Sequence, residues 1–329
     1  MREIIDCIDA GTEFCPCHLA ESNECILCSQ LQGNCFCDCI NWNGVCIYHE
    51  FISNGSKAKE GRKTYNCLVT DKVLYEKDFL LIKFQVPHKL AIDLAKPGSY
   101  VFIRTNENIY FDVPISVLES DIENNIISIM IEIRGIKTKK LLEIEVKGEI
   151  TIRGPYWNGV FGIKNLNIQK NKEVLVIARG IGMAPMMPIV RNLSLNNNNI
   201  NMLLDITPYK DNYVKDYLNK YNVKIVQEVI IDRGDLSDEA KVLIKRYIKE
   251  KDVNYIHVSG ADILSLKLIE YLKDISCDHV KVSCCNNSKM CCGEGICGSC
   301  TVRFSGRRVK RLCKLQTDPK NIFEGRRFI

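Results

Sequence analysis

The sequence predicts a multidomain protein of β and α/β type, in which an antiparallel β-barrel precedes a parallel doubly wound domain. Three observations predict this fold. Short apolar strands follow one another closely from residue 65 to residue 168. Strand and helix patterns then alternate over residues 169–283, which is typical of a parallel sheet with crossover helices. Residues 1–52 and 284–329 show neither pattern and are rich in cysteine.

The composition is that of an ordinary folded protein. Of the 329 residues, 46% are hydrophobic and 26% are charged, which excludes general disorder. The sequence has no run of about 18 apolar residues, so we expect no membrane span. The N-terminus lacks the apolar region of a secretory signal, so we expect a cytoplasmic, reducing location.

Metal rather than a hydrophobic core is expected to organise residues 1–52. Nine of the 18 cysteines lie in residues 1–50, and in a reducing compartment dense thiols more often ligate metal than form disulfides. They are too many for one tetrahedral zinc, so a further iron–sulfur cluster is favoured over zinc. Spacing does not fix which four bind; His18 and His49 are possible ligands, although exposed loop histidines are the simpler interpretation. The predicted metal ligands are Cys25, Cys28, Cys35, Cys37, Cys39 and Cys46, with Cys7, Cys15 and Cys17 upstream.

Residues 53–64 are small, polar and basic, which indicates a linker. The barrel is predicted over residues 65–168, because apolar or alternating segments there are separated by turn signals such as the Lys-Pro-Gly at 96–98. Its expected strands lie within residues 67–76, 79–86, 99–105, 126–135 and 143–154.

The α/β domain is predicted over residues 169–283, and it begins with a buried strand at 173–178. A glycine-rich turn, Arg179 to Pro185, follows that strand directly. Glycines in a strand-to-helix turn let a pyrophosphate approach the backbone and the helix N-terminus, so Gly180, Ile181 and Gly182 are predicted to bind a nucleotide. A tight turn without a ligand is the alternative. Further strands are expected at 201–207, 223–229, 254–260 and 279–283.

The most specific motif lies in the C-terminal segment, residues 284–329. Four cysteines there have the spacing C-x4-C-x2-C-x12-C, the plant-type [2Fe–2S] pattern. The intervening glycines permit tight wrapping and expose N–H groups to sulfur. An all-cysteine zinc site is the alternative, although such sites use two short cysteine pairs. Cys291 directly precedes the first ligand and Cys284 and Cys285 are surplus, so ligand choice stays open. The predicted ligands are Cys292, Cys297, Cys300 and Cys313.

Charge is unevenly distributed between the two ends. Residues 1–50 carry one basic and eight acidic residues, whereas residues 301–329 carry nine basic and two acidic ones. No recognition helix or stacking motif accompanies the basic tail, so nucleic acid is not expected as a partner. We expect the tail to dock on the acidic N-terminal segment or on an acidic electron-transfer partner, with a solvated face as the alternative.

In this order, the motifs resemble one family. Pro114-Ile115-Ser116 and a Gly-x-x-Thr turn at 135–138 lie in the barrel, the glycine-rich turn opens the α/β domain, and the cysteine motif follows. Over about residues 65–315 the chain resembles the electron-transfer subunit of class B dihydroorotate dehydrogenase. It is also similar to the small subunits of sulfide dehydrogenase and NADH-dependent ferredoxin:NADP oxidoreductase, all of the ferredoxin reductase superfamily.

This resemblance implies FAD in the barrel, a nicotinamide nucleotide, NAD(H) or NADP(H), in the α/β domain and a [2Fe–2S] cluster. Ile115 and Ser116 would lie near the flavin ring, and Lys137 and Thr138 would meet its phosphates. Residues 259–262 replace a Cys-Gly-Pro segment that helps to hold the nicotinamide in the family. The cofactor-binding residues implied are Pro114, Ile115, Ser116, Lys137, Thr138, Gly180, Ile181 and Gly182.

The chain departs from the family at the flavin phosphates. The family has arginine where Val113 stands, and Glu132 occupies a second basic position. Neutral or acidic side chains there remove charge-assisted hydrogen bonds of about 1.5–3 kcal/mol each. Lys137, Arg134 or Arg153 are candidates to compensate, so FAD is expected to bind less tightly.

The sequence therefore predicts an electron-transfer flavoprotein subunit that passes electrons between NAD(P)H, FAD, an iron–sulfur cluster and a partner. The partner would be a catalytic flavoprotein or a ferredoxin-type protein, and no catalytic acid, base or nucleophile is expected. One alternative is a dedicated dihydroorotate dehydrogenase subunit in pyrimidine synthesis. The other is a non-enzymatic iron–sulfur or zinc module that has lost FAD, for which Val113 and Glu132 are the evidence.

Overall fold

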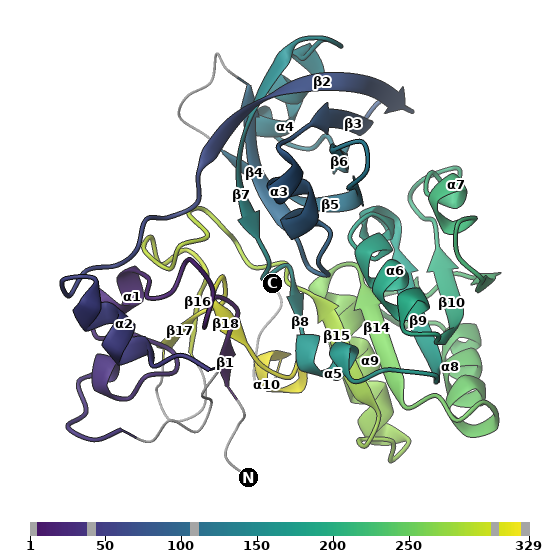
Figure 1. Cartoon of the computed structure of the whole chain (residues 1–329). Coiled ribbons are helices and arrows are strands. Elements are labelled where there is room, and N and C mark those ends of the chain that lie inside the picture. Colours follow the sequence, from purple (N-terminus) through teal and green to yellow (C-terminus); the bar gives the residue numbers. More distant parts are fainter. Residues whose placement is uncertain (1–4, 38–43, 106–111, 304–308, 324–329) are drawn as a thin grey trace.

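A computed structural model describes residues 5–37, 44–105, 112–303 and 309–323. The β-barrel stands above the α/β sheet, and the two cysteine-rich ends of the chain lie together beside both (Figure 1). The predicted β plus α/β architecture is confirmed. Within the described ranges, no helix has the length and apolar character needed to cross a bilayer.

Six antiparallel strands close the barrel in the order β2-β3-β6-β5-β4-β7. The long strand β2 closes it, because its first half pairs with β7 and its second half with β3. Inward-facing aliphatic side chains such as Leu80, Ile82 and Ile129 fill the interior. The elements are β2 (Thr64–Tyr75), β3 (Phe79–Gln85), α3 (His88–Leu94), β4 (Tyr100–Thr105), β5 (Val113–Asp121), β6 (Ile126–Glu132), α4 (Ile136–Lys140), η2 (Leu141–Glu143) and β7 (Glu149–Tyr156).

The α/β sheet has the order β11-β10-β9-β14-β15-β8, with β8 as an antiparallel edge. Strand β9 is buried on both faces, which explains its continuous apolar run. The chain proceeds from β9 to one side and later from β14 to the other, so the topological switch point lies between these strands. The elements are β8 (Val160–Phe161), α5 (Ile163–Asn167), β9 (Glu173–Arg179), η3 (Gly180–Met183), α6 (Met187–Leu195), β10 (Asn199–Asp205), α7 (Lys215–Leu218), β11 (Val223–Gln227), β12 (Ile231–Asp232), β13 (Asp235–Leu236), α8 (Asp238–Glu250), β14 (Tyr255–Ser259), α9 (Asp262–Asp274) and β15 (Lys281–Cys285).

The two ends of the chain form one unit, and β1 pairs with β18 in an antiparallel ladder. The N-terminal segment also has short helices and a small apolar cluster of Ala20, Leu31 and Phe51. The expectation that ligands alone organise it was therefore wrong, because apolar contacts fix these helices as well. The elements are β1 (Asp6–Cys7), α1 (His18–Glu21), η1 (Gln30–Gln32), α2 (Ile47–Ser53), β16 (Thr301–Arg303), β17 (Val309–Arg311), β18 (Leu315–Gln316) and α10 (Lys320–Phe323).

Within the described residues, two ion pairs join the acidic N-terminal segment to the C-terminal segment, as one of the predicted alternatives requires; residues 304–308 and 324–329 of the basic tail lie outside the described residues. Asp9 pairs with Lys314, and Glu24 pairs with Arg311. The predicted linker has no regular structure between α2 and β2, but it is more than a spacer. Arg62 within it is 7% exposed, because its guanidinium enters the contact between the two ends.

Candidate functional site

The C-terminal cysteine loop directs backbone N–H groups at sulfur. The amides of Glu294 and Cys297 donate to Cys292 Sγ at 3.3 and 3.5 Å, and the amide of Cys313 donates to Cys300 Sγ at 3.4 Å. Positive φ angles of 71°, 80° and 75° at the loop glycines make this wrapping possible. Such N–H···S contacts stabilise thiolate ligands. The glycines are Gly293, Gly295 and Gly298.

Hydrogen bonds favour the thiolate form of two of these cysteines by lowering the pKa of each. The hydrogen bond shared with Cys313 lowers the pKa of Cys300 to about 6 and raises the pKa of Cys313. Burial opposes ionisation of Cys297, but hydrogen bonds with Ser299 and Cys292 lower its pKa to about 7. These thiols suit a [2Fe–2S] cluster, in which two cysteine thiolates bind each of the two irons.

Of the neighbouring residues Cys291 and Cys292, the structure favours Cys292 as the cluster ligand. Its Sγ receives the two N–H donors, whereas Cys291 is exposed. Across the ranges that the structure describes, no three His, Cys, Asp or Glu side chains are spaced to hold a single metal ion.

The same loop packs against the barrel. A Cβ at Gly293 would lie 2.4 Å from the Tyr156 ring and 2.9 Å from the Phe102 ring, so only glycine fits there. Arg153 of β7 donates to the carbonyl of Cys292 at 3.0 Å. The loop is therefore fixed to strands β4 and β7.

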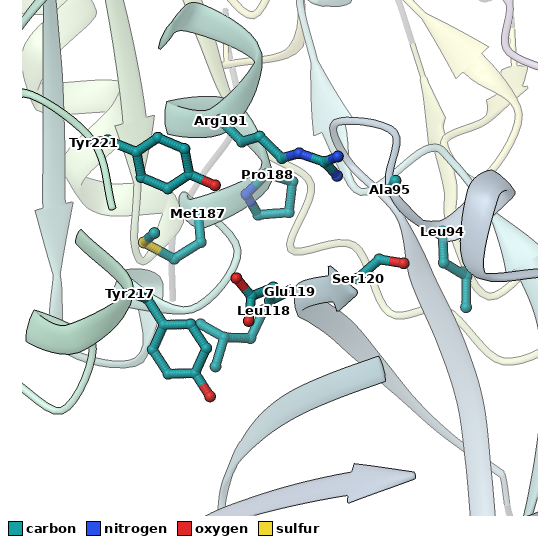
Figure 2. A pocket seen from close by; sticks show the side chains of 10 residues that line it. All are labelled: Leu94, Ala95, Leu118, Glu119, Ser120, Met187, Pro188, Arg191, Tyr217 and Tyr221. Atoms are coloured by element: carbon teal, nitrogen blue, oxygen red, sulfur yellow. The ribbon is translucent and has the colours of Figure 1, made fainter. Parts of the chain in front are cut away.

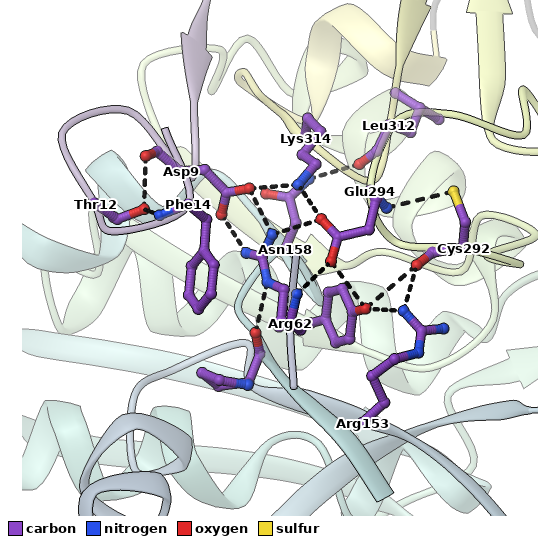
Figure 3. A network of polar contacts seen from close by, with 12 residues as sticks. Asp9, Thr12, Phe14, Arg62, Arg153, Asn158, Cys292, Glu294, Leu312 and Lys314 are labelled. Carbon is purple, nitrogen blue, oxygen red and sulfur yellow. Dashed lines mark hydrogen bonds and ion pairs between the residues drawn. The ribbon is translucent and has the colours of Figure 1, made fainter. Parts of the chain in front are cut away.

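Four buried charges join the loop to both ends of the chain (Figure 3). Arg62 donates to Asp9 Oδ2 at 2.9 Å and to Glu294 Oε2 at 2.8 Å. Lys314 donates to the same two carboxylates, at 2.5 and 2.9 Å. Glu294 lies between the predicted ligands Cys292 and Cys297, so two cations and two anions balance beside the loop.

The network keeps its carboxylates charged. Burial opposes the charged form of Asp9, but Lys314 and Arg62 outweigh it and lower the pKa to about 2. The same balance lowers the pKa of Glu294. Sequence analysis missed these four residues. Unequal charge at the two ends was the one available signal, and it did not indicate which residues pair.

Strand β5 places the predicted flavin-binding residues one strand away from the cysteine loop. Pro114 lies opposite Phe102 in the register of β5 and β4, and Ser116 lies opposite Tyr100. Tyr100 and Phe102 in turn pack with Tyr156 beside the loop. The predicted residue Ile115 lies between them, opposite Val101.

The cationic side chains near Val113 are already paired with carboxylates. Asp112 binds Arg104 at 2.9 Å and Arg153 at 3.0 Å, and Glu132 binds Arg134 at 2.8 Å. Two of the three candidate compensating cations are thus paired inside the protein.

The third candidate cation, Lys137, donates its Nζ to the Asp112 carbonyl at 3.2 Å. The Thr138 hydroxyl accepts from the amides of Arg134 and Gly135 at 3.0 and 3.2 Å. Thr138 therefore also stabilises the start of α4, independently of any phosphate.

The predicted nucleotide turn lies at the switch point, where open α/β sheets bind ligands. Gly180 to Gly182 follow the carboxyl end of β9, and Ser259 ends the neighbouring strand β14. Ser259 Oγ donates to the Gly182 carbonyl at 2.7 Å. A Cβ at Gly182 would lie 2.2 Å from the Ser259 carbonyl, so packing also requires this glycine. Ile181 lies between Gly180 and Gly182 and packs on the hydrophobic core beneath the turn.

A separate small pocket, with a cavity volume of about 10 Å³, lies between β5, α3 and α6 (Figure 2). None of the sequence-predicted site residues lines it. Its lining includes Leu94, Leu118, Glu119, Met187, Arg191 and Tyr217.

The predicted N-terminal ligands that the structure describes separate into a close pair and a group of exposed cysteines. Cys25 and Cys28 lie together, with the Cys28 amide donating to Cys25 Sγ at 3.4 Å. The imidazole of His18 pairs with Glu21. The backbone amide of His49 donates to the sulfur of Cys46, which caps α2. Cys39 lies outside the described residues. Among the other predicted ligands, Cys35, Cys37 and Cys46 are exposed.

Comparisons with known proteins agree with these observations. The chain is 28% identical over 226 residues to the electron transfer subunit of dihydroorotate dehydrogenase B (NAD(+)) from Clostridium acetobutylicum, covering 67% of this chain and 82% of that protein. It is 25% identical over 266 residues to the sulfhydrogenase 1 gamma subunit of Pyrococcus furiosus, covering 77% and 86%. No family model matches the chain.

Solved structures show the same fold. An NADH-dependent reduced ferredoxin–NADP oxidoreductase superposes with a TM-score of 0.60 at 18% identity, covering 78% of this chain and 89% of that one. The ferredoxin reductase of carbazole 1,9a-dioxygenase superposes with a TM-score of 0.52 at 13% identity, covering 68% and 69%. The predicted resemblance is confirmed: the chain is similar in sequence to electron-transfer subunits of dihydroorotate dehydrogenase B, and it has the ferredoxin reductase fold.

Proposed function

We propose that the chain carries electrons between a nicotinamide nucleotide and a partner oxidoreductase subunit through FAD and a [2Fe–2S] cluster. FAD binds along β5, the nucleotide binds at the switch point, and Cys292, Cys297, Cys300 and Cys313 ligate the cluster. The flavin supplies the conversion between two-electron and one-electron transfer, while the protein supplies position and electrostatics.

One observation carries the proposal: the cysteine loop is packed on the barrel beside the predicted flavin strand. Arg153 holds the Cys292 carbonyl, and Gly293 fits against Tyr156 and Phe102. Phe102 lies directly opposite Pro114 on β5. A cluster in the loop and a flavin on β5 are therefore separated by one strand and its aromatic side chains.

The residues of the two ligand sites have separate roles in this proposal. Ser116 offers a hydroxyl to the flavin ring, while Lys137 and Thr138 face its phosphates. The turn from Gly180 to Gly182 receives the pyrophosphate, because its backbone lies at the carboxyl ends of β9 and β14.

Anaerobic purification tests the proposal. We expect the full chain to contain FAD and iron with acid-labile sulfide, and NADH or NADPH to bleach the flavin and produce a reduced-cluster EPR signal. The Cys297→Ser variant should keep flavin reduction and lose that signal. A protein that contains iron but neither binds added FAD nor reacts with either nucleotide would contradict the proposal and support a non-enzymatic iron–sulfur module.

Oxidation of dihydroorotate by the partner is a second candidate, because the curated relatives include several dihydroorotate dehydrogenase B subunits. If it is correct, the chain should copurify with a catalytic dihydroorotate dehydrogenase subunit. Dihydroorotate should then reduce the flavin of the complex, and it should not reduce the flavin of the chain without that subunit.

The proposal includes a further metal centre in the N-terminal segment. Its cysteine content supports an iron–sulfur cluster, with zinc as the alternative, drawn from Cys25, Cys28, Cys35, Cys37, Cys39 and Cys46 and the three upstream cysteines. The iron and zinc content of a Cys292→Ser variant reports this centre separately from the C-terminal one.

A further inference from the structure

Four of the N-terminal cysteines share one pocket. Cys7, Cys15, Cys17 and Cys25 line a small cavity of about 20 Å³ beneath α1 and α2. Three of them come from outside the ligand set that the sequence favoured. Their spacing, C-x7-C-x-C-x7-C, is symmetrical about the Cys15–Cys17 pair and matches no short zinc knuckle.

The other walls of this thiol pocket are mostly apolar. The residues are Ala10, Phe14, Pro16, Leu19, Ala20, Ile26, Leu27 and Ile47. The one charged side chain in the lining, Asp9, is bound by Arg62 and Lys314. Sulfur is therefore the main ligand chemistry that the cavity offers, within the apolar envelope that tunes metal–sulfur centres.

The remaining cysteines of the segment are placed differently. Cys35, Cys37 and Cys46 are exposed, and none of them lines the pocket. The Cys28 amide donates to Cys25 Sγ, the same kind of N–H···S contact that the C-terminal loop makes. Cys25 is thus arranged as a ligand, and Cys28 supports it through its backbone.

The four thiols are the ligand set of an iron–sulfur cluster. Such clusters are held by four cysteine thiolates, whereas a single zinc needs its sulfur ligands about 2.3 Å from one point. No three His, Cys, Asp or Glu side chains in the described ranges are spaced around such a point.

The pocket adjoins the C-terminal cysteine loop. Leu19 lines the pocket, and a Cβ at Gly295 of the loop would lie 3.0 Å from Leu19 Cγ. Asp9 also lines the pocket and binds Lys314, the residue after Cys313. One layer of side chains therefore separates the two thiol groups.

We propose that Cys7, Cys15, Cys17 and Cys25 ligate an iron–sulfur cluster that is distinct from the C-terminal one and adjacent to it. The proposal deepens the proposed function, on which it rests for its iron–sulfur chemistry. It places the second centre beside the C-terminal loop, on the side of Gly295 that Leu19 contacts.

The test uses full chains purified anaerobically, with iron, zinc and acid-labile sulfide counted per chain. In Cys15→Ser and Cys17→Ser variants we expect iron to fall by about two to four atoms, the content of one Cys-ligated cluster. The EPR signal of the C-terminal cluster should persist in both, which also shows that the chain is folded. Cys35→Ser and Cys46→Ser are matched controls from the same segment and should keep the full iron content.

Three results would overturn the assignment: zinc in place of iron, unchanged iron in the Cys15→Ser and Cys17→Ser variants, or iron lost from the Cys35→Ser or Cys46→Ser control. Failure of the proposed function is distinguishable. In that case the Cys292→Ser variant has the iron content of wild type, while Cys17→Ser still loses iron.

Discussion

Asp9 and Lys314 form a buried ion pair at 2.5 Å, although 305 positions separate them in the sequence. Their side chains are 1% and 0% exposed. The pair joins the N-terminal cysteine-rich segment to the residue that follows the predicted ligand Cys313. Arg62 and Glu294 complete the charge balance, so the N-terminal segment is an integral part of the site.

Removing one charge from this network should destabilise the protein strongly. Asp9→Asn leaves two buried cations with one carboxylate, and breaking a buried pair costs about 3–5 kcal/mol. Urea unfolding of the purified chain measures the loss. Glu13→Gln, which breaks the exposed Glu13–Lys89 pair, is the control and should leave the unfolding free energy unchanged. Equal effects of the two substitutions would contradict the burial argument.

The choice of the first cluster ligand can be tested with neighbouring cysteines. Cys292→Ser should abolish the reduced-cluster EPR signal, because its sulfur receives the loop amides. Cys291→Ser should keep that signal, because Cys291 is exposed. The reverse pattern would assign ligation to Cys291.

Asp112 should weaken FAD binding by holding Arg104 and Arg153. Asp112→Asn removes the carboxylate partner of Arg104 and makes that guanidinium available to a pyrophosphate, while Arg153 keeps its bond to the Cys292 carbonyl. One added charge-assisted bond raises affinity about tenfold at 1.4 kcal/mol. Titration of the apoprotein with FAD measures this change. Glu119→Gln on the same strand is the control, since Glu119 pairs with Lys220 away from the predicted flavin residues. Unchanged or weaker FAD binding in Asp112→Asn would exclude this role for Asp112.

Arg179 is the basic side chain at the predicted nucleotide turn, and Asp205 holds it at 2.9 Å. Arg179→Gln should weaken NADH or NADPH binding about tenfold, through loss of one charged contact. Asp205 keeps other donors from Thr207 and Ile230, so the fold should survive. Arg191→Gln, in the pocket of Figure 2, should bind the nucleotide as wild type does. Equal affinities of the two variants would place the nucleotide elsewhere.

His257 should make the protein less stable in mild acid. Burial lowers the pKa of His257 from 6.5 to about 3, and its Nε2 has no hydrogen-bond partner within the described residues. Between these pH values the unfolded chain binds a proton that the folded chain excludes, so stability falls as pH drops below 6.5.

The loss should reach about 1.6 kcal/mol between pH 6.5 and pH 5, because the slope approaches 1.36 kcal/mol per pH unit below pH 6.5. Unfolding free energies of wild type and His257→Leu at these two pH values measure it. The variant should lack this pH dependence, even if it is less stable overall. Parallel pH profiles for the two proteins would show that His257 does not titrate in this way.

The sequence by itself determined the order of the barrel and the α/β domain, and it predicted the kinds of chemistry. Short strands predicted the barrel, the alternation of strand and helix predicted the parallel sheet, and the spacing from Cys292 to Cys313 predicted a cluster loop. These signals are local, because side-chain periodicity, turn glycines and ligand spacing act over a few residues.

Tertiary structure alone decided how distant residues meet. Asp9, Arg62, Glu294 and Lys314 come from three separate stretches, and nothing local in the sequence shows that their charges balance. The same holds for the pairing of Asp112 with two arginines and for the four thiols of one pocket. Long-range packing sets these contacts, because buried charges need partners wherever the fold brings them together.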